Sequence, residues 1–159
     1  MKRNVHLTTL GIIALFISAS FCCAQTPPVR WVQQAISTNS LSGSGVTLDG
    51  FGNSYVVGSL YKTARFGVVT LDSGAGVNLS LVKYDSAGKP LWAVKAGGTN
   101  SNSSTSAKSV ASDGLGNVYI AGNFTGEAAF GDFRITNSIG PAPGFVAKVE
   151  MDPKIKTRG

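Results

Sequence analysis

Short runs that are apolar on both sides of a strand dominate the hydrophobic pattern of this 159-residue chain. Tyr55-Val56-Val57 and Val118-Tyr119-Ile120-Ala121 show no alternation of polar and apolar positions. That pattern is typical of strands in a sheet whose two faces are both covered. No stretch shows a sustained helical period. The pattern therefore predicts an all-β fold.

The expected strands are short and are separated by turns rich in Gly, Asn and Asp. They lie at residues 31–36, 45–48, 53–59, 64–71, 79–84, 90–95, 108–112, 117–123, 130–136 and 145–149, with a loop at 97–106. Asp49-Gly50-Phe51-Gly52 predicts a hairpin turn between two of them, because Asp accepts backbone N–H bonds and Gly adopts positive φ.

A ten-residue segment occurs twice, as DGFGNSYVVG at 49–58 and as DGLGNVYIAG at 113–122, an offset of 64 residues (113 − 49). Phe-Gly pairs, a Lys and a Trp recur at nearly the same offset. A long fixed period indicates stacked copies of one supersecondary unit. The turn residues that repeat are expected to have a structural role; they are Asp49, Gly52, Asn53, Asp113, Gly116 and Asn117.

The first 24 residues are typical of a secretory signal peptide, with Lys2 and Arg3 ahead of an apolar stretch and a cleavage site between Ala24 and Gln25. Retention as a membrane anchor or lipid attachment remains an alternative. Residues 25–30 then form a Pro-rich lead, 31–153 a repeat region divided into 31–95 and 96–153, and 154–159 a basic tail. We expect a secreted protein, extracellular or periplasmic, without stable membrane insertion after cleavage.

Composition excludes several kinds of chemistry. Cys22, Cys23 and His6 all lie in the signal segment, so the mature protein would have no thiol or imidazole for catalysis or for structural zinc. Charged residues make up 14% of the chain, and its formal net charge of +6 is scattered rather than clustered. A nucleic-acid partner would require a basic stripe, so none is expected, and neither is a cofactor or a bound metal.

Six segments of the chain resemble the bacterial SBBP propeller repeat. They read VTLDGFGNSYVVGS, RFG, LVKYDSAGKPLWAVKAGG, SVASDGLGNVYIAGNF, AFG and FVAKVEMD. The resemblance implies β-propeller blades of four antiparallel strands, two blades in this chain, with Trp31 and Trp92 on outer strands. A ring needs about four to eight blades. We therefore expect a fragment of a longer propeller, or a homo-oligomer that completes a ring.

The resemblance and the scarcity of ionisable residues favour a non-catalytic module that binds carbohydrate or protein. Candidate contacts are Trp31, Tyr61, Arg65 and Trp92, because aromatic faces and guanidinium groups suit sugars and polar ligands. The two tryptophans stand at equivalent positions of the repeat, which favours packing between blades as their alternative role.

A glycoside-cleaving enzyme is the alternative function, because a carboxylate pair is the acid–base chemistry that remains available. The acids of the mature chain are Asp49, Asp72, Asp85, Asp113, Glu127, Asp132, Glu150 and Asp152. Most occupy turn or strand-end positions, so no catalytic residue is expected. Calcium in the Asp49 and Asp113 turns is a further alternative, although capping of the turn uses the same side chains.

Overall fold

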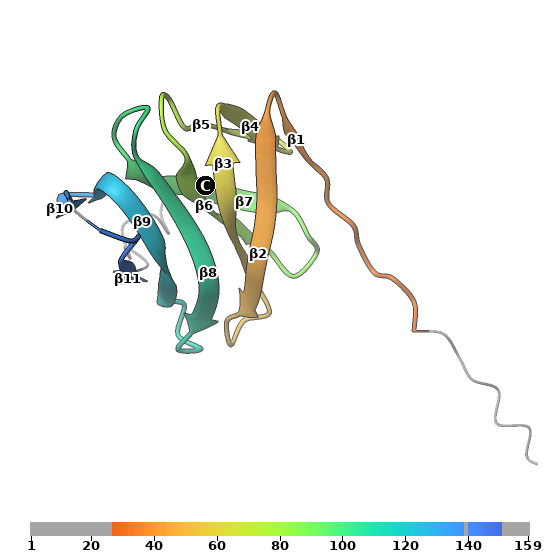
Figure 1. Cartoon of the computed structure of the whole chain (residues 1–159). Coiled ribbons are helices and arrows are strands. Elements are labelled where there is room, and N and C mark those ends of the chain that lie inside the picture. Colours follow the sequence, from red (N-terminus) through yellow and green to blue (C-terminus); the bar gives the residue numbers. More distant parts are fainter. Residues whose placement is uncertain (1–26, 139, 151–159) are drawn as a thin grey trace, which may run out of the picture.

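The computed structural model describes residues 27–138 and 140–150, and within these residues the fold is all-β, as the pattern predicted (Figure 1). The strands are β1 (Ala35–Ser37), β2 (Ser40–Leu48), β3 (Ser54–Tyr61), β4 (Thr63–Phe66), β5 (Val69–Asp72), β6 (Asn78–Tyr84), β7 (Pro90–Gly98), β8 (Ser104–Ser112), β9 (Val118–Phe130), β10 (Phe133–Asn137) and β11 (Gly144–Val149). The described part contains no helix long and apolar enough to cross a membrane.

The first repeat, residues 40–98, forms an antiparallel sheet in the order β2-β3-β6-β7. A hairpin of β4 and β5 is inserted between β3 and β6, and β1 pairs with β4 at its edge. The predicted DGFG turn is confirmed, since the Asp49 N–H donates to the Asn53 carbonyl and Gly52 has φ 79°.

The second repeat, residues 104–149, builds a matching sheet in which β8 and β11 flank β9. β9 is long because it joins the counterparts of β3 and β4 in one strand, and β10 pairs with its far half as β5 pairs with β4. A β-bulge interrupts the first strand of both repeats, between Gly43 and Gly45 and between Ala107 and Ser109. Each strand of the second repeat therefore has a counterpart in the first, whereas β7 of the first repeat has no counterpart among the described residues of the second.

One glycine of the repeated segment is required by the close approach of the bulged strand. A Cβ on Gly58 would lie 1.7 Å from the carbonyl oxygen of Ser42, and one on Gly122 would lie 2.1 Å from that of Ser106. Neither distance is compatible with a side chain. The repeat therefore contains this glycine because two backbones meet at this point.

The end of β7 pairs with β9, which joins the sheets of the two repeats into one hydrogen-bonded path. Beyond this junction the two sheets pack against each other (Figure 1). Their shared core consists of Tyr55, Val57, Leu79, Leu81, Ala107, Val118 and Ile120. We call the face of the first sheet that carries Tyr55, Val57 and Leu81 the covered face. The turns also meet, since the Gly50 N–H donates to the Gly114 carbonyl at 2.8 Å.

The opposite face of the first sheet, here called the outer face, holds a second cluster. Its buried members are Leu60, Ala64, Phe66, Val82 and Tyr84. Residues 30–37, which begin at the end of the Pro-rich residues 25–30 and are called the lead segment from here on, cover part of this face together with the β4–β5 hairpin. Val46 and Leu48 near the edge of this face are exposed.

The expected cover on both faces is confirmed for Tyr55-Val56-Val57, in which Tyr55 and Val57 are buried and Val56 is half-buried. It was wrong for Val118–Ala121, because one face of this segment is buried through Val118 and Ile120 while Tyr119 on the other is 40% exposed.

Four details of the expected strands were wrong. No strand begins at Trp31; the chain is extended there without ladder bonds until β1 starts at Ala35. Residues 64–71 form a hairpin because Gly67, with φ 58°, reverses the chain. The expected loop at 97–106 is shorter because β7 and β8 extend into it, and residues 130–136 are divided by a turn at Gly131. The expected signal segment, 1–24, and the whole of the expected basic tail, 154–159, lie outside the described residues.

Candidate functional site

The turn of the first repeat holds a buried polar cluster around Asp49. Oδ1 of Asp49 accepts the backbone N–H groups of Phe51 and Asn53, both at 2.9 Å. Oδ2 accepts the Asn53 amide at 2.8 Å and the Tyr55 hydroxyl at 3.0 Å, and the Lys83 ammonium lies 3.5 Å away. The Asp49 side chain is fully buried. This carboxylate therefore joins the turn to the strands beside it.

Charge and burial act in opposite directions on this cluster. Burial would raise the pKa of Asp49, but the hydrogen bonds from Asn53, Phe51 and Tyr55 outweigh it and hold that pKa below its ordinary value. Burial also raises the pKa of Tyr55, and its bond to Asp49 adds to the effect. The carboxylate is thus ionised and the phenol is neutral at physiological pH, as a structural cluster requires.

The second repeat carries the same residue types in an exposed setting. Oδ1 of Asp113 accepts the N–H groups of Leu115 and Asn117 at 2.8 and 3.1 Å, and the Asn117 amide bonds Oδ2. The bond from Asn117 holds the pKa of Asp113 below its ordinary value. Tyr119 is 40% exposed. The hydrogen bonds that the Asp side chain accepts from the turn are the same in both repeats. Tyr55 is buried against the second sheet, whereas among the described residues no further sheet packs over Tyr119.

Lys148, the counterpart of Lys83, takes a different partner. Its ammonium lies 2.6 Å from a Glu150 oxygen, and this bond raises the pKa of Lys148. We call the surface formed by Tyr119, Ala121, Val146 and Lys148 the open face of the second sheet. Val146 on this face is 77% exposed, whereas its counterpart Leu81 is fully buried.

The carboxylates of Asp49 and Asp113 thus accept hydrogen bonds from groups of their own turns. Both oxygens of Asp49 accept donors of the chain, which is the capping alternative to a calcium ion. Within residues 27–138 and 140–150, no three His, Cys, Asp or Glu side chains gather as metal ligands.

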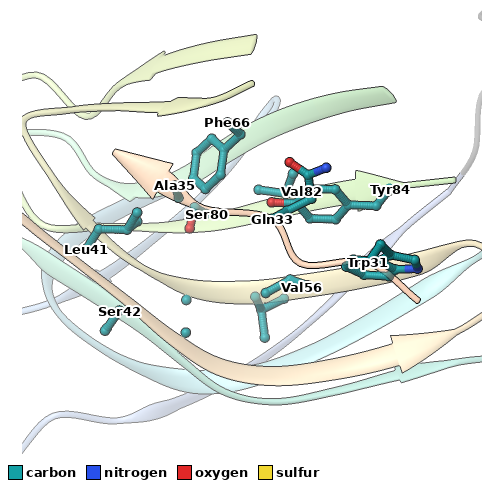
Figure 2. A pocket seen from close by; sticks show the side chains of 13 residues that line it. Trp31, Gln33, Ala35, Leu41, Ser42, Val56, Phe66, Ser80, Val82 and Tyr84 are labelled. Atoms are coloured by element: carbon teal, nitrogen blue, oxygen red, sulfur yellow. The ribbon is translucent and has the colours of Figure 1, made fainter. Parts of the chain in front are cut away.

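Trp31 lies against the outer face beside a cavity of about 210 Å³ (Figure 2). Its ring stacks on Tyr84, with centroids 6.2 Å apart and planes 24° from parallel. The lining also includes Ala35, Leu41 and Val56. The cavity is thus an apolar gap between the lead segment and the first sheet.

The structure does not bring the four predicted ligand contacts into one pocket. Trp92 packs edge-on against Tyr55 at 6.0 Å, within the core between the sheets. Tyr61 is half-buried at the end of β3, with the Lys62 ammonium 5.2 Å from its ring. Arg65 is exposed on β4, and its Nε donates to the Gly67 carbonyl at 2.7 Å. Only Trp31 lines the cavity of Figure 2.

Sequence reasoning missed a larger groove of about 1090 Å³ in the second repeat. It runs beside β11 and is lined by Phe124, Phe130, Phe133 and residues 143–148, among others. The rings of Phe130 and Phe145 lie 4.8 Å apart in it. Four phenylalanines within residues 124–145 were the available signal, but their shared location depends on the pairing of β9 with β10 and β11.

Three further carboxylates, those of Asp72, Asp85 and Glu127, also have structural partners. Asp85 Oδ1 accepts the N–H groups of Ala87 and Lys89, and Asp72 accepts that of Gly74. Glu127 pairs with Arg134 at 2.7 Å.

The family comparison identifies the repeat. The model described as "SBBP: Beta-propeller repeat" matches residues 30–59 and 92–124. The first match begins one residue before Trp31 and the second begins at Trp92, and both run through the glycine-rich turn into the following strand. The comparison with curated proteins gave no match.

Proposed function

We propose that this chain, which carries two SBBP beta-propeller repeats, acts as an exported, non-catalytic module whose surface binds carbohydrate or protein or serves as a scaffold. The observation that supports this most is the use of its carboxylates. Asp49, Asp85 and Asp113 cap turns, and Glu127 and Glu150 pair with cations. These engaged acids offer no free pair for glycoside cleavage.

Tyr61 and Arg65 are the contacts that remain suited to a ligand. Trp92 is engaged in the core with Tyr55, and Trp31 stacks on Tyr84. Arg65 is exposed and has guanidinium donors besides the one held by Gly67. Tyr61 and Arg65 lie on strands that follow each other in the chain, β3 and β4. An aromatic ring and a guanidinium offer stacking and forked hydrogen bonds to a sugar or a carboxylate.

A binding screen tests the proposal. The purified protein is applied to an array of polysaccharides and immobilised extracellular proteins, and each hit is repeated with Arg65→Ala and Tyr61→Ala. We expect a loss of at least tenfold in affinity for each variant and no change for the control Arg134→Ala. A ligand that binds both variants with the affinity of the parent protein would contradict the assignment of these contacts.

Catalysis and export are tested separately. Incubation with the same polysaccharides should release no reducing ends, and turnover that disappears in Asp132→Asn would overturn the non-catalytic proposal. Mass spectrometry of the protein from the culture medium or periplasm should show a chain that begins at Gln25. A chain that retains residues 1–24 in the membrane fraction would contradict export.

A further inference from the structure

The lead segment occupies the same place relative to the first repeat as β7 occupies relative to the second. The end of β7 pairs with β9 through Gly97 to Ala129 and Gly98 to Ala128. The end of the lead pairs with β4 through Ile36 to Arg65 and Ser37 to Ala64. The offset from Ile36 to Gly97 equals that from Trp31 to Trp92, namely 61 residues (97 − 36). The lead is therefore the structural counterpart of β7.

β7 is bonded along its body, whereas the lead is not. Trp92 and Ala93 of β7 pair with Lys83 and Val82 of β6, so β7 completes the first sheet. The corresponding residues of the lead, Trp31 and Val32, lie before β1 and belong to no strand. Val32 is 79% exposed. The lead segment thus has the position of an outer strand in the repeat, but its residues before β1 form no ladder with a sheet.

β11 shows the converse. It is the counterpart of β6, which is bonded on both edges and buried at all seven positions. β11 pairs only with β9 within the described residues, and its exposure alternates along the strand. The groove of about 1090 Å³ follows this unpaired edge. β11 thus belongs to a sheet without its outer strand.

The two apolar faces are complementary in the same way. On the covered face, Tyr55, Val57 and Leu81 contact the second sheet. Their counterparts on the open face are Tyr119, Ala121 and Val146. Inside the molecule, Tyr55, Val57 and Leu81 pack against the face of the second sheet that carries Val118 and Ile120. The equivalent face of the first sheet is its outer face, which carries Val56 beside the cavity of Figure 2. The molecule therefore carries both halves of its own internal interface.

We propose that a second copy of this chain completes the structure: its lead segment pairs with β11 as an outer strand, and its outer face covers the open face of the second repeat. Trp31 of one copy then lies opposite Lys148 of the other, and Val32 opposite Ala147. The Trp31 ring meets the edge of Tyr119, as Trp92 meets Tyr55.

The lead segment and β11 of one molecule cannot pair with each other, because they lie at opposite ends of it. The lead leaves beside β1 and β2, while β11 lies at the far side of β8 and β9 (Figure 1). The contact is head-to-tail, so successive copies close into a ring when the rotation permits. This inference does not depend on the ligand proposed above.

Cysteine cross-linking in a defined register tests the interface, using protein in which Cys22 and Cys23 are replaced by serine. Val32→Cys and Ala147→Cys are prepared separately and mixed in a glutathione redox buffer. Their counterparts Ala93 and Val82 are direct cross-strand partners, a spacing that permits a disulfide. We expect a disulfide-linked heterodimer, in at least tenfold higher yield than from Val32→Cys mixed with Val146→Cys, since a shift of one residue points to the other face.

A blocking variant provides the matched control. Val146→Lys places a charge in the centre of the open face at a side chain that is 77% exposed in the single copy, so the fold tolerates it. Adding Val146→Lys to the Ala147→Cys chain should abolish the heterodimer while leaving its circular dichroism unchanged. Equal yields from the two cysteine pairs, or a yield that Val146→Lys does not reduce, would overturn the proposal.

Discussion

The repeated turn provides a comparison of one carboxylate in two environments within one molecule. Asp49→Ala and Asp113→Ala remove the same hydrogen bonds to the turn. Only Asp49→Ala also leaves a buried Tyr55 hydroxyl and a Lys83 ammonium, whose side chain is 9% exposed, without their partner. Breaking a buried charge pair on one side costs about 3 to 5 kcal/mol. Asp113 has no buried partner, so its variant should stay close to the parent.

The measurement is urea unfolding followed by circular dichroism, with both substitutions made in the Val146→Lys background so that each molecule is a single copy. With a slope of about 2 kcal/mol per molar urea, Asp49→Ala should lower the midpoint by about 1.5 to 2.5 M. The midpoint for Asp113→Ala should move far less.

Equal shifts for the two variants would refute the reasoning. They would mean that the second sheet does not bury the Asp49 cluster, and that face-to-face packing of the repeats is absent in solution. Asp49→Asn, which keeps the shape of the side chain, should fall between Asp49→Ala and the parent.

Three further predictions use unfolding measurements on the same background. The pKa of Asp49 is lower in the folded state, so the stabilisation by its carboxylate is present above the unfolded pKa of about 4 and is lost as the pH falls through the folded pKa. Asp49→Asn should therefore flatten the loss of folding stability between about pH 5 and pH 2. An unchanged pH profile of stability would contradict this. Gly58→Ala, whose Cβ would meet the Ser42 carbonyl, should destabilise by about 3 kcal/mol or more, whereas Gly43→Ala, with open space around it, should remain within about 1 kcal/mol of the parent. Trp92→Ala should cost about 3 kcal/mol because its ring packs in the core between the sheets, and a cost under about 1 kcal/mol would show that the ring is solvated.

The sequence was sufficient to predict the repeated elements, because the same local rules act in each copy. Asp49 and Gly52 specify a turn through one carboxylate and one positive φ, and the structure has both. The hairpin at Gly67 was missed because its residues read as one continuous strand until the chain reverses.

The state of the lead could not be predicted from local pattern. Trp31 has the sequence context of an outer strand, and it lies in the first segment that the family model matches, as Trp92 lies in the second. Whether it forms a ladder depends on a partner edge, which is a property of the assembly rather than of the segment. The groove beside β11 was missed for the same reason, since it is the position that an outer strand would fill.

The central claim is that the two ends of this molecule are complementary halves of one interface. Light scattering on the purified protein across a series of concentrations, coupled to size exclusion, tests this most directly. The account predicts a molar mass that is a whole-number multiple of one chain, two or greater, and that returns to a single chain in Val146→Lys. A folded single copy that persists at tens of micromolar in the parent protein would contradict it.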